Sequence, residues 1–177
     1  MDFIEHQQEL TTLVDNILSE AERQGADQAE VSASMEQGLG VSVRRGELEN
    51  LEFNQDRGFG ITLYVGKRKG SASTTDSSPD AIRATVAAAK GIARHTEEDP
   101  YSGLADALLM PSEAIDLDLY HPWDIEPEQA TALAVECEAA GLAVDKKLTN
   151  SDGAQISTQQ ALHIYGNSHG FIGAYPS

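Results

Sequence analysis

The chain has little of what disulfide-bonded, thiolate-metal and membrane proteins depend on. Cys137 is its only cysteine in 177 residues, so an internal disulfide and a cage of thiolate ligands are both excluded. No apolar run comes near the roughly 18 residues that a membrane helix needs. The N-terminus has neither the basic nor the apolar part of a leader peptide. We therefore expect a globular protein of the cytoplasm that does not enter a membrane.

Positive charge is scarce too, and much of it lies in one segment. Lys and Arg number 12 against 29 Asp and Glu, which gives a formal net charge of −17. This balance disfavours direct binding to nucleic acids and to anionic membranes, because Lys and Arg must displace counterions there. Residues 57–95 are the exception, with 7 basic and 2 acidic side chains, and they lie between two acidic segments.

Apolar residues at helical spacing predict three helices. The first covers about residues 5–24 and stops at Gly25. The second opens at Ser78, a capping residue followed by a proline that the first turn tolerates. The third begins at Pro127 and carries a stripe of mostly small side chains that includes Cys137. A free cysteine in such a stripe is expected to be a small buried hydrophobe rather than a nucleophile.

Period-two alternation predicts strands between and after these helices. The segments around residues 31–35, 39–43, 51–53, 59–65 and 70–74 alternate in this way. Glycines at positions 38, 46 and 58 indicate tight turns, and turns this short join antiparallel neighbours. Later strands are expected near residues 148–157, 162–165 and 171–175, after an extended acidic connection from about residue 96 to 126.

The combined pattern predicts an α+β fold. An antiparallel β-meander of four or five strands, from near Ala29 to Thr75, is expected to be covered on one face by the helices. The sequence ends within an expected strand, at Ser177. Because a bare strand edge is unfavourable, we expect residues 1–177 to be one domain of a longer chain.

Catalytic and metal-binding motifs are hard to find in the sequence. A zinc hydrolase usually carries a helical H-E-x-x-H frame, and none of the five histidines stands in one. His163 and His169 flank an expected turn and could approach each other, but a third ligand is missing, so turn and surface positions explain them as well. No dinucleotide or phosphate loop occurs. We therefore assign no catalytic residue, metal ligand or cofactor to this chain.

Three consecutive cations, Lys67, Arg68 and Lys69, are expected at an exposed hairpin tip. They either protect the strand edge and aid solubility, or form a docking point for an acidic partner or peptide.

Several separated segments resemble one known family. They read VSVRRGELENLEFN (41–54), GFGITLY (58–64), KGSASTTD (69–76), DLYHP (118–122) and YGNSHG (165–170). In this order they are similar to the N-terminal region of the PmbA (TldE) branch of the TldD/PmbA protease family. The resemblance extends over nearly the whole chain.

The resemblance implies a subunit of a cytoplasmic zinc-dependent protease that acts on small or unfolded polypeptides. In that family the TldD-type partner carries an H-E-x-x-x-H helix with the zinc, and the PmbA-type subunit does not. This chain is then the N-terminal, non-catalytic part, paired with a TldD-type subunit or with a second copy of itself. A stand-alone binding module, such as an inhibitor or adaptor, is the alternative function.

Overall fold

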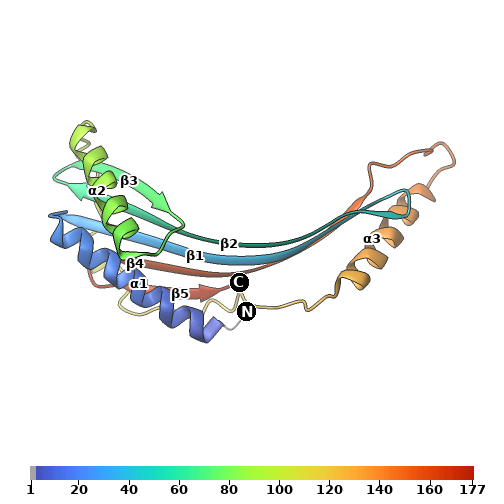
Figure 1. The fold of residues 1–177 in the computed structure, drawn as a ribbon, viewed down its shortest axis with the longest axis horizontal. Helices are drawn as coiled ribbons and strands as arrows, with labels where there is room; N and C mark the ends of the chain where they lie inside the picture. Colours follow the sequence, from blue (N-terminus) through green and yellow to red (C-terminus); the bar gives the residue numbers. More distant parts are fainter. Residues whose placement is uncertain (1–2) are drawn as a thin grey trace. The chain divides into compact units, whose positions relative to one another are not determined.

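The computed structural model describes residues 3–177, with side chains from His6 onward. Five strands form one antiparallel sheet in the order β3-β2-β1-β4-β5, accompanied by three α-helices and a short 3₁₀ helix (Figure 1). The α+β fold predicted from the sequence is thus confirmed. In chain order the elements are α1 Phe3–Arg23, β1 Gln28–Arg44, β2 Glu47–Val65, β3 Arg68–Thr74, α2 Pro79–His95, η1 Ala107–Leu109, α3 Pro127–Leu142, β4 Ala154–Asn167 and β5 Ile172–Pro176.

The chain divides into two compact units. Unit 1 comprises the chain up to Met35 together with Arg57–Leu119 and Leu162–Ser177, and unit 2 comprises Glu36–Asp56 and Tyr120–Ala161. Within residues 3–177, none of the helices combines the length and the apolar character needed to cross a membrane.

The strands are fewer and longer than predicted. β1 runs unbroken through Gly38 and β2 through Gly58, where turns were expected. Neither glycine has a positive φ angle. A Cβ added to Gly38 would stand 2.5 Å from the carbonyl oxygen of Thr158, so this glycine allows a neighbouring strand to approach closely. The meander from Ala29 to Thr75 therefore has three strands, and β4 and β5 complete the sheet.

Of the other predictions, the β1–β2 turn and the irregular connection after α2 agree with the structure, whereas the strands after α3 differ. The turn between β1 and β2 has positive φ at both Arg45 (55°) and Gly46 (77°), which is the two-residue hairpin geometry that suits the twist of paired strands. The predicted strands near 148–157 and 162–165 are one strand, β4, which begins only at Ala154. The connection after α2 is irregular except for η1, as expected.

In unit 1, α1 and α2 cover one face of the sheet. The apolar stripe of α2, predicted from its spacing, is buried, and β1 and β2 contribute alternate side chains to the same cluster. The buried residues of this core are Leu10, Val14, Ile17, Ala21, Ala29, Val31, Ala33, Met35, Phe59, Ile61, Leu63, Ile82, Val86, Ala89, Leu162 and Ile164.

Gly70 of β3 lies directly beneath α2. A Cβ at this position would stand 2.1 Å from the carbonyl oxygen of Ala89 and 2.4 Å from the backbone nitrogen of Ala93. The backbones of strand and helix are therefore in contact, and only glycine fits between them.

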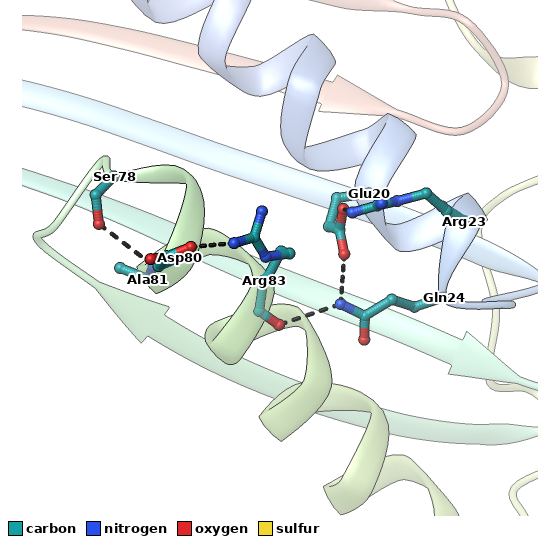
Figure 2. A network of polar contacts seen from close by, with 7 residues as sticks. All are labelled: Glu20, Arg23, Gln24, Ser78, Asp80, Ala81 and Arg83. Carbon is teal, nitrogen blue, oxygen red and sulfur yellow. Dashed lines mark hydrogen bonds and ion pairs between the residues drawn. The ribbon is translucent and has the colours of Figure 1, made fainter.

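A polar network joins the end of α1 to the beginning of α2 (Figure 2). The buried carboxylate of Glu20 accepts hydrogen bonds from Arg23 and from Gln24 Nε2, the latter at 2.6 Å. Gln24 Nε2 also donates to the carbonyl oxygen of Arg83 at 3.1 Å. The hydrogen bond from Gln24, aided by Arg23, holds the pKa of Glu20 below its ordinary value although burial opposes this. Ser78 caps α2 by accepting from the Ala81 nitrogen, as its sequence position predicts.

In unit 2, α3 packs on β1 through only part of the predicted stripe. Ala130 and Ala134 are fully buried against Val41 and Val43. Glu138 continues this stripe, and its carboxylate accepts hydrogen bonds from the backbone nitrogens of Arg45 (2.9 Å) and Gly46 (2.8 Å).

Because Glu138 faces the sheet, its neighbour along the helix turns away from it. The prediction that Cys137 is buried is accordingly wrong, and its thiol is exposed. The predicted stripe is correct at Ala130 and Ala134, but its next member is Glu138 rather than Cys137.

Candidate functional site

The histidines do not form a metal site. Among the side chains that the structure describes, from His6 onward, no three of His, Cys, Asp or Glu gather where they could hold a metal ion. His163 lies on β4, and its ring stacks on Tyr175 with a centroid distance of 5.0 Å. His169 lies exposed in the turn before β5. A catalytic zinc needs about three protein ligands, so the described residues do not fit the zinc of a metallopeptidase.

The three consecutive cations do not share one environment. Lys67 is exposed in the turn between β2 and β3, and its Nζ donates to the carbonyl oxygen of Ser102 at 3.2 Å. Arg68 is only half-exposed. It donates to the carbonyl oxygen of Arg94 near the end of α2 at 3.1 Å and approaches Glu98 at 3.5 Å.

Lys69 lies exposed on β3, beyond the turn itself. The expectation of three exposed cations at a hairpin tip therefore holds for Lys67, while Arg68 joins β3 to α2. Of the three cations, Lys67 and Lys69 are the more exposed.

The sheet face opposite α1 and α2 carries a groove in unit 1. Its volume is about 720 Å³. Small residues from three strands line one part of it, and aromatic rings from β4 and β5 line another, so an extended chain has both space and apolar surface there. The lining includes Ser32, Ser34, Gly58, Gly60, Ser73, His163, Tyr165 and Tyr175.

Two tyrosines share one carboxylate on this face. The hydroxyl of Tyr64 donates to Glu30 Oε1 at 2.9 Å, and the hydroxyl of Tyr165 donates to Glu30 Oε2 at 3.0 Å. Burial, together with the hydrogen bond to Glu30, raises the pKa of Tyr64 to about 12. Burial chiefly raises the pKa of Tyr165 as well. Glu30 thereby ties β2 to β4 across β1 and fixes one end of the polar face.

The sequence did not predict that Glu30 joins these two tyrosines. Alternation places Glu30 on the polar side of its strand, but Tyr64 and Tyr165 come from segments 34 and 135 residues away. No local pattern links three such positions.

We expect replacement of Glu30 by glutamine to lower the pKa of Tyr64 from about 12 toward its ordinary value of 10.0. The change removes the negative charge that opposes the phenolate, while burial keeps part of the shift. The measurement is an alkaline titration of phenolate absorbance in the parent chain and in the variant. An unchanged late-titrating fraction in the variant would mean that burial alone sets the shift.

Comparison with known proteins identifies the class of this chain. Residues 29–93 match the model of the PmbA/TldA metallopeptidase domain 1, and residues 120–177 match that of the PmbA/TldA metallopeptidase central domain. The chain is thus built from domains of a metallopeptidase. It belongs to the PmbA/TldD family.

Curated relatives agree with this assignment. The chain is 48% identical over 152 residues to Metalloprotease PmbA of Escherichia coli O157:H7, which covers 86% of this chain and 34% of that protein. It is 44% identical over 171 residues to the Metalloprotease PmbA homolog of Haemophilus influenzae, covering 97% and 38%. The chain therefore spans little more than a third of the length of these relatives.

Solved structures share the fold at low identity. A putative modulator of DNA gyrase from Bacteroides thetaiotaomicron superposes with a TM-score of 0.80 at 20% identity, covering 94% of this chain and 38% of that one. TldE from Thermococcus kodakarensis gives 0.71 at 16% identity, covering 93% and 37%.

Proposed function

We propose that this chain is the non-catalytic N-terminal part of a PmbA (TldE)-type subunit, which works with a TldD-type, zinc-bearing partner on small or unfolded polypeptides. The observation that carries the proposal is the conjunction of two findings. The chain belongs to a metallopeptidase family, yet the residues that the structure describes offer no three-ligand cluster for a metal. The chemistry of peptide cleavage must then come from elsewhere in the assembly.

The contribution of this chain is to bind and orient extended polypeptide. The groove on the open face of unit 1 combines serine and glycine with aromatic rings, and such a surface tolerates varied side chains. A zinc ion held by a TldD-type partner would supply the Lewis-acid chemistry of peptide cleavage. A single cysteine and a strongly acidic balance fit a cytoplasmic protein that does not bind nucleic acid directly.

The proposal is tested by zinc titration calorimetry and a peptide-cleavage assay on the same preparation. Alone, this chain is expected to show no sub-micromolar affinity for zinc and no cleavage of an unfolded peptide, because a tight site needs about three ligands. A TldD-type subunit combined with a full-length PmbA-type subunit is expected to cleave the same peptide in a chelator-sensitive way. Zinc-dependent turnover by this chain alone would overturn the non-catalytic assignment.

Lys67 in the β2–β3 turn and Lys69 on β3 give a test of pairing with an acidic partner. We expect Lys67→Glu combined with Lys69→Glu to slow association and weaken its dependence on salt, because both charges steer the encounter. Arg68 is left intact because it joins β3 to α2.

Association rates at two ionic strengths provide the measurement. Lys146→Glu combined with Lys147→Glu is the matched control, since it makes the same change of charge at exposed positions in unit 2. Equal rates in the two double variants would leave the turn with only a solubilising role.

A further inference from the structure

A pocket in unit 2 lies where the chain enters α3. Its volume is about 360 Å³, and its lining comes from β1, β2 and β4 and from residues 123–127, all of which belong to this unit. A volume near the lower end of known ligand sites has room for one side chain rather than for a folded partner. The pocket is therefore suited to a single residue of an extended chain.

Two large aromatic side chains of this pocket are exposed. Trp123 is 56% exposed and Phe53 of β2 is 68% exposed, although both line the pocket. Leu39 of β1 completes the apolar part of the same wall. Single exposed apolar residues are common, but two rings gathered in one hollow mark a place where a ligand or partner binds.

The loop that carries Trp123 is held in place. The backbone nitrogen of Ile125 donates to the carbonyl oxygen of Trp123 at 2.9 Å, which closes a tight turn with Asp124 at its centre. The side chain of Ile125 packs against the buried cluster between α3 and β1, and α3 begins at Pro127. The pocket is therefore formed before any ligand enters it.

The charged side chains of the lining are both carboxylates. They are Asp124 and Glu126, and the described lining contains no lysine, arginine or histidine. Glu126 is the N-cap residue of α3, but its side chain makes no capping hydrogen bond. Among the ion pairs of the residues that the structure describes, none includes either carboxylate. The pocket is therefore negative and holds no cation from its own lining.

The position of Glu126 has a simpler explanation in part. Carboxylates are favourable near the N-terminus of a helix, where backbone N–H groups lack partners. This accounts for an acidic residue before α3, but not for the two exposed rings beside it. Aromatic rings and carboxylates together attract a cation, since the ring faces and the negative charges both favour positive charge.

Arginine fits this combination better than lysine does. Its planar guanidinium stacks on aromatic faces and donates to carboxylates in a fixed fork, whereas the lysine ammonium is a strongly hydrated point charge. Net charge also favours a foreign ligand over a second copy of the chain, because two molecules of charge −17 repel each other.

We propose that this pocket binds an arginine side chain from an extended segment of the substrate polypeptide. The guanidinium lies against the rings of Trp123 and Phe53 and pairs with Asp124 and Glu126, while the neighbouring residues of the segment stay outside. The inference rests on the proposed function for its biological setting and names a residue that the non-catalytic chain selects.

The test uses the intrinsic fluorescence of the 177-residue chain, so it does not depend on cleavage. Trp123 is the only tryptophan, and its emission therefore reports on the pocket itself. The probe is a short capped peptide of serines around one central arginine. We expect a saturable change of emission with a dissociation constant on the order of millimolar, because one side chain offers few atoms.

Two further peptides test the chemistry of the occupant. Citrulline in place of arginine keeps the shape of the side chain but removes its charge, and this peptide is expected to bind at least about fivefold more weakly. Lysine in the same place keeps the charge but lacks the planar fork, so it is also expected to bind more weakly than arginine.

A double variant locates the site, and a matched double variant is the control. Asp124→Asn with Glu126→Gln removes both charges but keeps the side-chain size and the tryptophan, and it is expected to weaken binding of the arginine peptide by about fivefold. Glu128→Gln with Glu136→Gln removes the same charge from exposed positions of α3 outside the lining and is expected to leave the affinity unchanged. Circular dichroism checks that both variants fold.

Three outcomes overturn the inference. Binding of the citrulline or the lysine peptide as tight as that of the arginine peptide would exclude a guanidinium site. Equal affinities of the two double variants would place the peptide outside this pocket. A change of Trp123 emission with protein concentration alone, lost in the variant of Asp124 and Glu126, would make a second copy the occupant. Failure of the cleavage assay with a TldD-type subunit would sink the proposed function instead and leave peptide binding untouched.

Discussion

Replacing Gly70 by alanine is expected to destabilise the chain by about 2–3 kcal/mol, the upper range for overpacking a tight contact. The new methyl group would meet the carbonyl oxygen of Ala89 at 2.1 Å and the nitrogen of Ala93 at 2.4 Å. Both are backbone atoms within α2, so no side-chain rotation relieves the clash. The helix must move away from β3, which opens the core of unit 1.

A second glycine, in α2 itself, provides a control, because its replacement is expected to raise stability rather than lower it. Gly91 lies within α2, and a Cβ there would meet nothing within 4 Å. Gly91→Ala is expected to stabilise by about 0.5–1 kcal/mol, because alanine loses less conformational entropy in a helix. Denaturant unfolding followed by circular dichroism measures both changes. Equal and small effects of the two substitutions would contradict the close contact of β3 with α2.

The second large effect is expected at Glu138, whose carboxylate accepts from two backbone nitrogens of the β1–β2 turn. Glu138→Ala leaves both donors without this partner and is expected to lower the thermal midpoint of unfolding by several degrees. Glu138→Gln keeps one accepting oxygen but brings an amide donor against a backbone donor, so a smaller loss is expected. Glu136→Gln, at an exposed position of the same helix, is the matched control.

The effect of Glu138 should depend on pH. The hydrogen bonds from the backbone of Gly46 and Arg45 lower the pKa of Glu138 below its ordinary value of 4.5. A carboxylate whose pKa is lowered by folding stabilises the folded chain at every pH above its unfolded-state pKa. This stabilisation is lost as the pH falls through the folded-state pKa. The difference in midpoint between the parent chain and Glu138→Ala should therefore stay constant from neutral pH down to 4.5 and shrink as the pH falls further. A difference that stays constant below pH 4.5 as well would mean that the turn does not require the ionised carboxylate.

Features that depend on residues close in the sequence could be predicted from the sequence. Ser78 caps α2 because the donor it satisfies is three residues away, and Gly46 makes a turn because its own φ is positive. The apolar stripe of α2 follows from spacing alone. These features predicted the α+β class and the helix boundaries, but not the extent of β1, β2 and β4.

Distant contacts account for what the sequence did not reveal. Gly38 looks like a turn residue, but its role is set by Thr158 on another strand. Glu138 looks like a surface residue, but its partners in the β1–β2 turn lie 92 and 93 residues away. Ala130, Ala134 and Glu138 follow one another at intervals of four residues, so they lie on the same side of a helix. This spacing was the available sign that Glu138 faces the sheet.

The exposed thiol of Cys137 has a practical consequence. Because the sequence contains no other cysteine, oxidation can join this sulfur only to a thiol from outside the chain. Samples stored without a reductant are then open to covalent pairing of two molecules through α3, which non-reducing electrophoresis would resolve from true non-covalent assembly. The same thiol is a single attachment point for a fluorophore or spin label on the helix that carries Glu138, and it needs no engineered substitution.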